Sequence, residues 1–260
     1  MPIQFYKYQG TGNDFILIDN RKNEIELLPE QIKLLCDRRF GIGADGLMLL
    51  ELEPGADFKM IYFNSDGNPS SMCGNGGRCI TAFAKQLGLI TNKAKFLAVD
   101  GFHEALIDEN EIVSLKMQDV KSIEIGADYF YLNTGSPHYV KIVNNIQNFE
   151  VVKHGKEIRY NSRFKEEGTN VNFVEKINDE LFVRTYERGV EDETYSCGTG
   201  VTAAALVAAL EGISNSKNNC IIKTLGGNLE VTFDKVLEQN FYNIWLKGPA
   251  QKVFEGTIGL

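Results

Sequence analysis

The sequence predicts an α+β fold of two pseudo-symmetric, β-rich domains, each a mainly antiparallel sheet around a central helix. Short segments recur in the same order at a nearly constant offset, β-rich runs outnumber helical patterns, and each of two Cys-Gly-x-Gly turns opens an apolar helical run. The chain of 260 residues is 43% hydrophobic and 24% charged, an ordinary globular composition that is sufficient for two medium domains.

The recurrence indicates a duplicated domain. Three pairs of segments share composition and order: Thr11–Phe15 with Thr134–His138, Gly43–Asp45 with Gly168–Asn170, and Cys73–Gly76 with Cys197–Gly200. Their offsets are 123, 125 and 124 residues. We therefore predict an N-terminal domain over residues 1–117 and a C-terminal domain over residues 118–249.

Strands supply most of the predicted elements. The β-rich runs are Phe58–Phe63, Lys95–Val99, Ile112–Met117, Leu181–Tyr186, Ile221–Thr224, Leu229–Phe233 and Tyr242–Leu246. Three helices are predicted. The first begins at Pro29 and carries an apolar stripe over Ile32–Cys36, and the others, Arg78–Leu87 and Val201–Leu210, follow the cysteine turns.

Charge and apolar patterning exclude several classes of partner. The 27 Lys and Arg against 35 Asp and Glu give a net charge of -8, which disfavours nucleic acid and anionic membranes. The longest strongly apolar run, Val201–Leu210, is too short to cross a bilayer, and the N-terminus lacks a signal-peptide pattern. We therefore expect a cytoplasmic protein.

The segment Gly41–Gly46 spells the dinucleotide fingerprint G-x-G-x-x-G, but in the wrong context. That motif needs a strand before it and a helix N-terminus after it to hold a pyrophosphate. Here a helix is predicted before it and a strand after it, so nucleotide binding is not expected.

Cys73 and Cys197 are the candidate reactive groups. Each stands at a predicted helix N-terminus, where unpaired N–H groups and the positive end of the helix dipole stabilise a thiolate and can hold a carboxylate. If the duplicated domains face each other, the two turns can flank one ligand. Cys36, Cys79 and Cys220 belong to apolar patterns and are interpreted as structural.

The five cysteines are expected to be reduced, because none forms a Cys-x-x-Cys pair. The three histidines, His103, His138 and His154, are scattered along the chain, so no metal site is predicted.

Several polar residues stand at strand ends or in the turns beyond them. They are Asn13, Asn64, Asn170, Glu187 and Arg188. Together with the two helix ends they form a plausible binding site for a small zwitterion, since Glu187 and Arg188 supply both signs of charge.

Six blocks carry a family resemblance: Gly10–Phe15, Arg39–Gly46, Phe63–Gly67, Met72–Cys79, Gly168–Phe173, and Tyr186–Gly189 with Cys197–Gly200. In order and spacing they resemble the signature blocks of the diaminopimelate epimerases, over nearly the whole chain. The resemblance implies two pseudo-symmetric barrel-like domains, an active site in the cleft between them, and a C-terminal tail, residues 250–260, that returns to the first domain.

The resemblance also implies roles for individual residues. Cys73 and Cys197 would be the acid/base thiols, with Glu187 and His138 beside them influencing their protonation. The implied substrate-binding residues are Asn13, Asn64, Gly74, Asn75, Ser136, Asn170, Glu187, Arg188, Gly198 and Thr199. Two positions depart from many family members: Gly46 replaces a glutamine, and Ser136 replaces an asparagine.

The resulting hypothesis is epimerisation of LL-2,6-diaminopimelate to meso-diaminopimelate, in lysine and peptidoglycan precursor synthesis. It needs no pyridoxal phosphate, because no lysine lies in a motif for a Schiff base, and the resemblance implies a homodimer. One alternative is a two-cysteine racemase for proline or hydroxyproline, which would not need Arg188 for a distal carboxylate. Another is a binding or redox module whose thiols form a regulated disulfide.

Overall fold

The structure is a computed structural model that describes residues 2–70, 72–178, 180–214, 216–237 and 239–259. The chain divides into two compact units. Unit 1 is Met1–Leu115 with Pro249–Leu260, and unit 2 is Lys116–Gly248. The last segment of the chain therefore belongs to the same unit as the first.

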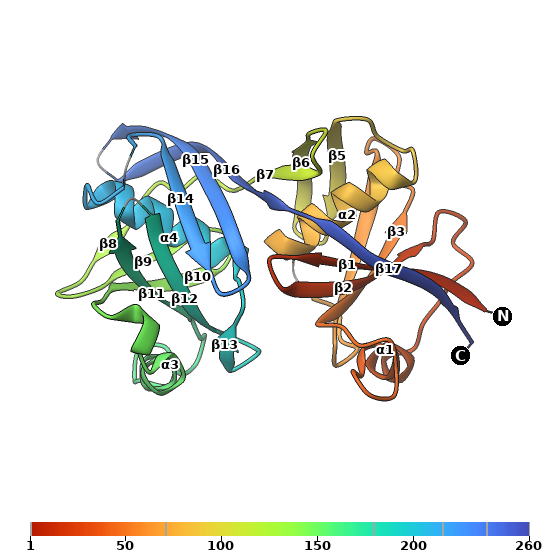
Figure 1. Cartoon of the computed structure of the whole chain (residues 1–260), viewed down its shortest axis with the longest axis horizontal. Helices are drawn as coiled ribbons and strands as arrows, with labels where there is room; N and C mark the ends of the chain where they lie inside the picture. Colours follow the sequence, from red (N-terminus) through yellow and green to blue (C-terminus); the bar gives the residue numbers. More distant parts are fainter. Residues whose placement is uncertain (1, 71, 179, 215, 238, 260) are drawn as a thin grey trace. The chain divides into compact units, whose positions relative to one another are not determined.

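Unit 1 contains two helices, α1 (Pro29–Cys36) and α2 (Gly74–Gln86). Its strands are β1 (Ile3–Gly10), β2 (Asn13–Asp19), β3 (Gly46–Glu51), β4 (Phe58–Asn64), β5 (Lys93–Ala98), β6 (Gly101–Ile107), β7 (Ile112–Lys116) and β17 (Gln251–Ile258). The pairs β17–β1, β1–β2, β3–β4, β5–β6 and β6–β7 are antiparallel, and the pairs β2–β3 and β4–β5 are parallel. Figure 1 shows β17, in blue, lying along β1, in red.

Unit 2 contains α3 (Val151–Arg159), α4 (Gly198–Leu210) and the 3₁₀ turn η1 (Ile146–Asn148). Its strands are β8 (Glu124–Ile125), β9 (Phe130–Asn133), β10 (Pro137–Ile142), β11 (Asn170–Ile177), β12 (Glu180–Glu187), β13 (Asp192–Thr194), β14 (Asn219–Thr224), β15 (Gly227–Leu237) and β16 (Asn240–Pro249). The pairs β10–β11 and β12–β14 are parallel, and the pairs β8–β9, β9–β10, β11–β12, β14–β15 and β15–β16 are antiparallel.

The two units repeat one another strand for strand. The series β1 to β7 has the same pairing order and the same parallel steps as the series β9, β10, β11, β12, β14, β15, β16. Registers agree as well, because Phe15 pairs with Gly46 and His138 pairs with Asn170. The predicted α+β class with two pseudo-symmetric, β-rich domains is confirmed.

Each unit buries one helix almost completely. The helix α2 is buried from Gly74 to Ala84, and α4 is buried over most of its length, where Ala, Val and Leu predominate. Glycines in the first turns make room for side chains of the sheet, since a Cβ on Gly76 would lie 2.5 Å from Cε of Met48 and one on Gly200 would lie 2.3 Å from Oδ1 of Asn172. Both helices begin directly after a cysteine, as the sequence predicted, although their first turns start earlier than the predicted Arg78 and Val201.

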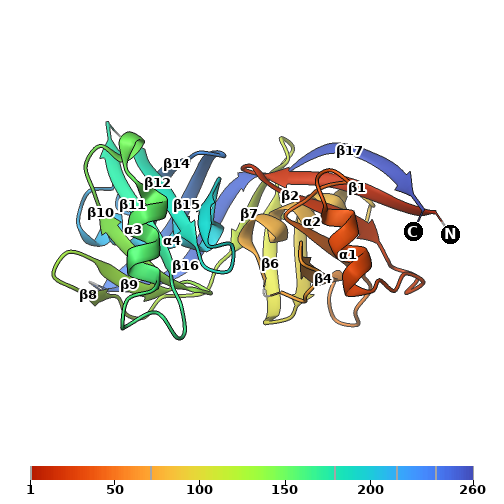
Figure 2. The same ribbon diagram turned by 90° about the horizontal axis from the view of Figure 1, so that it is seen from below.

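The helix α3 was not predicted. It starts with two β-branched valines and contains Gly155, residues with low helix propensity. Packing explains it. A Cβ on Gly155 would lie 2.4 Å from the Cβ of Tyr186, so only glycine lets this helix approach strand β12 so closely. Figure 2 shows α3 beside β11 and β12.

The glycine-rich loop has the context that the sequence indicated, with α1 before it and β3 after it. A Cβ on Gly41 would lie 2.0 Å from the carbonyl oxygen of Leu34, and the N–H of Gly43 donates to the carbonyl of Leu35. The glycines therefore allow the chain to fold back over the C-terminal end of α1, which is the wrong helix end for a pyrophosphate.

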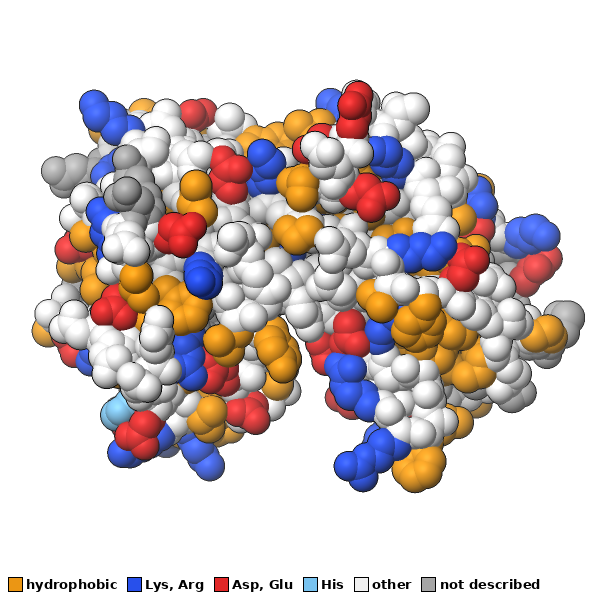
Figure 3. All heavy atoms as spheres, viewed as in Figure 1, with side chains coloured by type: hydrophobic (Ala, Val, Ile, Leu, Met, Phe, Trp, Pro, Cys, Tyr) orange, Lys and Arg blue, Asp and Glu red, His pale blue; other side chains and the backbone are white. Residues whose placement is uncertain are grey.

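Among the residues that the structure describes, none of the helices has the length and apolar character to cross a membrane. Acidic and basic side chains are interspersed over the face of each unit drawn in Figure 3.

Candidate active site

In unit 1, Cys73 is the N-cap residue of α2 and is half-buried. Its backbone is extended, with φ -111° and ψ 128°, and its carbonyl accepts the N–H of Gly77 at 2.7 Å. Its side chain does not cap the helix. The first-turn N–H groups of α2 point toward the same end of the helix as the thiol, a position where such groups can bind an anion.

Asn13 links the thiol to the rest of the unit. Its Oδ1 accepts from the Cys73 thiol at 3.6 Å and from Nδ2 of Asn75 at 3.2 Å. Its Nδ2 donates to Oδ2 of Asp45 at 2.7 Å. Three residues that the sequence assigned to the site, Asn13, Cys73 and Asn75, are thus in contact, and Asp45 fixes the orientation of the Asn13 amide.

A network of charges holds this arrangement. Lys7 bonds the carbonyl of Gly43 and forms an ion pair with Asp14 at 2.6 Å. Arg38 pairs with Asp14 at 2.6 Å and with Asp45 at 2.8 Å. Burial raises the pKa of Asp14, but the hydrogen bonds from Arg38 and Lys7 outweigh it and lower that pKa to about 2. Sequence analysis missed these partners because they meet only through the β2–β3 register.

A buried cation lies under the start of α2. Arg78 is 0% exposed, and its guanidinium donates to neutral oxygens of Thr11, Gly74 and Pro249. Burial lowers its pKa from the ordinary value, and the thiols of Cys79 and Cys73 act in the opposite direction. This positive charge is one helical turn from Cys73, where it favours a thiolate.

Asn64, the remaining predicted residue of unit 1, ends strand β4 opposite Gly46. Its exposed side chain stands on the strand next to the one that carries Asp45 and Gly46. We call Asn13, Asn64, Cys73, Gly74 and Asn75 the unit 1 half-site.

In unit 2, Cys197 is the N-cap of α4, with φ -115° and ψ 110°, and is 8% exposed. Its Sγ lies 3.5 Å from Oγ1 of Thr199, and its carbonyl accepts the N–H of Val201 at 2.8 Å. Thr134 donates from Oγ1 to the carbonyl of Thr199 at 2.8 Å, which anchors the turn before β10 against the first turn of α4. The predicted Ser136 stands in that turn, half-buried.

His138 is fully buried in β10. Its Nδ1 lies 3.1 Å from Nδ2 of Asn172, and Asn172 also donates to the carbonyl of Tyr139 and accepts from Oγ1 of Thr185. Burial, with a smaller contribution from Arg188, lowers the pKa of His138 to about 3. The imidazole is therefore neutral, and its buried Nε2 has no hydrogen-bond partner among the described residues.

Asn170 connects two other predicted residues to the sheet. Its Oδ1 accepts the backbone N–H of Arg188 at 2.9 Å, and its Nδ2 donates to the carbonyl of Pro137 at 3.2 Å. Arg188 is exposed, and its guanidinium donates to the carbonyl of Glu167. Glu187 accepts from Oγ1 of Thr194 at 2.8 Å.

The predicted residues of unit 2 therefore gather at the ends of β10, β11 and β12 and at the start of α4. We call them the unit 2 half-site: Ser136, His138, Asn170, Glu187, Arg188, Cys197, Gly198 and Thr199. Sequence analysis missed Asn172, Thr134 and Thr185, which position these residues. The only available signal for Asn172 was its place two residues after Asn170, in the block Gly168–Phe173.

The other three cysteines are in apolar surroundings. Burial raises the pKa of Cys36 and of Cys79 to about 12 and that of Cys220 to about 11. All three thiols stay protonated at neutral pH, which fits their predicted structural role. Within the described part of the chain, no three His, Cys, Asp or Glu side chains are grouped to hold a metal ion.

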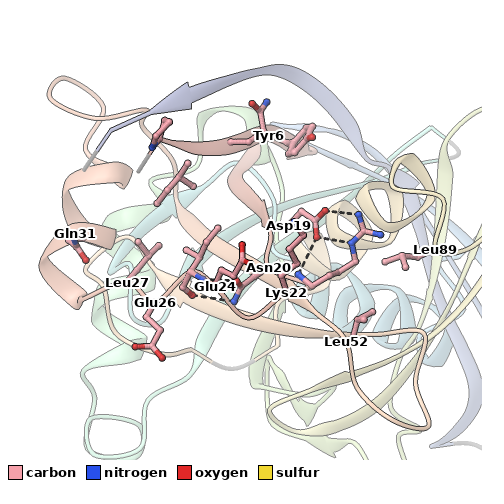
Figure 4. Close-up of a pocket in the computed structure, with 15 residues that line it drawn as sticks. Tyr6, Asp19, Asn20, Lys22, Glu24, Glu26, Leu27, Gln31, Leu52 and Leu89 are labelled. Carbon is pink, nitrogen blue, oxygen red and sulfur yellow. Dashed lines mark hydrogen bonds and ion pairs between the residues drawn. The ribbon is translucent and has the colours of Figure 1, made fainter.

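A separate depression of about 830 Å³ opens on unit 1 (Figure 4). It is lined by β1 and by the loop after β2, and its charged side chains Asp19 and Arg21 form a paired contact at 2.6 and 2.8 Å. None of the predicted site residues lines it. It contributes neither a thiol nor an imidazole to acid/base chemistry.

Comparison with known proteins gives closely related sequences. A family model described as diaminopimelate epimerase matches residues 5–120 and 130–253. The diaminopimelate epimerase of Flavobacterium psychrophilum is 55% identical over 261 residues, covering 98% of this chain and 100% of its own. That of Chlorobaculum tepidum is 45% identical over 260 residues, covering 96% of this chain and 99% of its own.

Solved structures share the fold at low identity. A phenazine biosynthesis protein of the PhzF family from Bacillus anthracis superposes with a TM-score of 0.76 at 15% identity, with 100% of both chains covered. A hydroxyproline epimerase from Agrobacterium vitis gives 0.73 at 13% identity, covering 100% of this chain and 93% of that one. At such identities the likeness extends to the fold alone.

Proposed function

The chain belongs to the diaminopimelate epimerase family, and we propose that it interconverts LL- and meso-2,6-diaminopimelate in lysine and peptidoglycan precursor synthesis. It is an isomerase. The observation that carries the proposal is the pair of thiols at equivalent places of a duplicated fold, each the N-cap of a buried helix. Inversion of an α-carbon needs one proton acceptor and one proton donor on opposite faces, which such a pair provides.

In the proposed mechanism one cysteine is a thiolate and the other a thiol. The thiolate removes the α-proton and becomes a thiol, and the electron pair of the broken C–H bond stays on the substrate. The second thiol then delivers its proton to the opposite face and becomes the thiolate. Product release leaves the two cysteines in exchanged protonation states, ready for the reverse reaction.

Proton transfer alone is too weak to explain such catalysis. General acid/base catalysis supplies about 3 to 5.5 kcal/mol, whereas enzymes lower barriers by about 8 to 23 kcal/mol. We propose that the backbone N–H groups at Gly74–Asn75 and Gly198–Thr199 bind the α-carboxylate and stabilise the negative charge that develops on it. Preorganised donors contribute about 3 to 4 kcal/mol each in such sites, which closes most of the difference.

The two half-sites would prepare their thiols differently. Beside Cys73, the buried Arg78 supplies a positive charge. In unit 2 a neutral His138 and the carboxylate of Glu187 would exchange protons with Cys197 or orient its S–H. We propose that Asn13, Asn64, Ser136 and Asn170 hold the polar groups of the substrate and that Arg188 binds the distal carboxylate.

The identity of the substrate is tested by incubating the purified protein with LL-diaminopimelate in deuterated water. The expected product is meso-diaminopimelate with one deuterium on the inverted α-carbon, formed without added pyridoxal phosphate or metal. Turnover of proline or hydroxyproline in its place would support the alternative racemase. A protein that exchanges no α-proton but forms a reversible disulfide would support the redox alternative.

The two thiols are tested by Cys73→Ser and Cys197→Ser. A serine hydroxyl does not ionise near neutral pH, so each change should lower kcat by about a hundredfold or more. The matched control is Cys220→Ser, which replaces a buried thiol with a raised pKa. Full loss of activity in a folded Cys220 variant, with activity kept in the other two, would contradict the assignment.

We also propose that the protein is a cytoplasmic homodimer. The exposed Val253 and Phe254 on β17 offer apolar surface for self-association. Light scattering after size-exclusion chromatography should then give twice the chain mass of 29.1 kDa. A mass of one chain at micromolar concentration would contradict the dimer, and recovery in a membrane or secreted fraction would contradict the location.

A further inference from the structure

The space beside Gly46 is filled by the side chain of another residue. A Cβ built on Gly46 would lie 2.5 Å from Cε2 of Tyr62 and 3.0 Å from the Tyr62 hydroxyl oxygen. Side chains do not approach that closely. The Tyr62 ring and the carbonyl oxygen of Phe63, 2.6 Å from that Cβ, together leave no room for a side chain at position 46. The phenol stands where a side chain from Gly46 would otherwise project.

The repeat shows what kind of group belongs at this position. Gly46 pairs with Phe15 as Asn170 pairs with His138, so Gly46 and Asn170 are equivalent. In unit 2 this position carries an amide that contacts the backbone of Arg188 and that we assign to the substrate. In unit 1 the same register has no side chain of its own, and among the described residues the side-chain polar atom nearest to a Cβ built on Gly46 is the Tyr62 hydroxyl oxygen, at 3.0 Å.

Tyr62 also points to the correct face of the sheet. Side chains two residues apart on a strand share a face, so Tyr62 and Asn64 of β4 lie on one side. Met48, the register partner of Tyr62, reaches the first turn of α2, where its Cε lies 2.5 Å from a Cβ built on Gly76. The face that carries Tyr62 is therefore the one that the start of α2 covers.

Packing fixes the ring but leaves it partly accessible. The Tyr62 and Phe15 rings meet edge to face, with centroids 6.0 Å apart and planes at 76°. Phe15 is fully buried, whereas Tyr62 is half-buried. A ring held in this way presents its hydroxyl with little loss of side-chain entropy on binding.

We propose that Tyr62 is a substrate-contacting residue of the unit 1 half-site, whose hydroxyl replaces the polar side chain that position 46 lacks. This rests on the proposed epimerase function and adds a specificity residue to it. The pair acts as one unit: glycine at 46 makes room for the ring, and the ring supplies the hydrogen-bonding group.

The first test is Tyr62→Phe, which keeps the ring against Phe15 and Gly46 and removes only the hydroxyl. A lost hydrogen bond to a charged substrate should lower kcat/KM for LL-diaminopimelate by about tenfold to a hundredfold. The matched control is Tyr6→Phe. Tyr6 is half-buried in β1 of the same unit but lines the depression of Figure 4, so its change should leave kcat/KM unaltered.

The second test measures binding without turnover. LL-diaminopimelate should protect Cys73 from alkylation by iodoacetamide, and the concentration for half-protection should rise in Tyr62→Phe by about the same factor as KM. A merely structural hydroxyl would not move this concentration.

The third test enlarges the space beside Gly46. Tyr62→Val removes the ring and its hydroxyl together and should lower kcat/KM. Gly46→Gln should collide with the Tyr62 ring and with the carbonyl oxygen of Phe63, 2.6 Å from an added Cβ, and destabilise the protein.

The outcomes separate the two proposals. An active wild type whose Tyr62→Phe variant keeps full kcat/KM and the same half-protection overturns the role of Tyr62 and leaves the epimerase function standing. A wild type that neither epimerises nor binds diaminopimelate overturns the function and the Tyr62 proposal together.

Discussion

Asn172 donates a hydrogen bond from Nδ2 to Nδ1 of the buried His138, 3.1 Å away. The orientation of the Asn172 amide is fixed, because its Nδ2 also faces the carbonyl of Tyr139, which can only accept. Since the amide nitrogen can only donate, Nδ1 of His138 must be the acceptor. The ring proton is therefore on Nε2, which is buried.

Asn172→Asp should reverse this tautomer. A carboxylate accepts, so the ring proton would move to Nδ1 and Nε2 would lose its hydrogen. We expect the ¹⁵N chemical shifts of the His138 ring to exchange and kcat to fall by at least about tenfold. The exposed Asn148→Asp is the control, and unchanged shifts in a folded Asn172→Asp protein would show that another group sets the tautomer.

The pKa of His138 predicts a specific pH dependence of stability. Burial lowers that pKa to about 3, whereas an unfolded chain has a histidine pKa of about 6.5. Between these values the unfolded chain binds a proton that the folded protein does not, so the free energy of unfolding falls as the pH is lowered. The slope from this one group is at most about 1.4 kcal/mol per pH unit.

The measurement is urea unfolding of wild type and His138→Gln between pH 7 and about 4.5, above the range where most carboxylates titrate. The variant should lose this part of the slope. His154→Gln, which changes an exposed ring, should keep it. Parallel curves for wild type and His138→Gln would mean that His138 is protonated in the folded protein.

Arg78→Met should slow the reaction of Cys73 with iodoacetamide. The variant removes the buried positive charge near the thiol, so the thiolate fraction should fall by about tenfold at neutral pH. The rate is followed by mass spectrometry of the Cys73 peptide. The reaction of Cys197 is the internal control, because Thr202 occupies the position in α4 that Arg78 occupies in α2. Equal slowing of both thiols would indicate a general change of fold.

Gly155→Ala should destabilise unit 2, although alanine is the better helix former. The added Cβ would lie 2.4 Å from the Cβ of Tyr186, and overpacking of this kind costs about 1 to 3 kcal/mol. Denaturant unfolding measures the loss. Lys153→Ala on the same helix changes only an exposed side chain and should stay within about 0.5 kcal/mol of wild type. An equally stable Gly155→Ala protein would show that α3 can shift away from β12.

The duplication made much of this fold predictable. Each match in the sequence marks the same place in both units: the turn before β2 and β10, the start of β3 and β11, and the N-caps of α2 and α4. Periodicity found β4, β5, β7, β12, β14, β15 and β16, since alternating apolar residues have one buried face, but it did not find others such as β6, β9 and β17. It failed at α3, because Gly155 is favoured there by close packing against Tyr186 and not by helix propensity.

The supporting groups of the site could not be predicted in the same way. Lys7 and Asp14 meet because β1 pairs with β2, and Arg38 reaches Asp14 from the turn after α1. Tyr62 fills the space at Gly46 because its side chain reaches diagonally from β4 to β3. Such contacts follow from tertiary geometry, for which a single sequence carries no local pattern.

The pairing of β17 with β1 also sets the order in which the units can be completed during synthesis. Ile3 pairs with Ile258, so the sheet of unit 1 gains the strand β17 only after residues 251–258 have left the ribosome. Unit 2 is continuous from Lys116 to Gly248 and has all its strands before that moment. The usual order, in which an N-terminal domain finishes folding first, is therefore reversed, and β1 keeps an unpaired edge while the rest of the protein is being made.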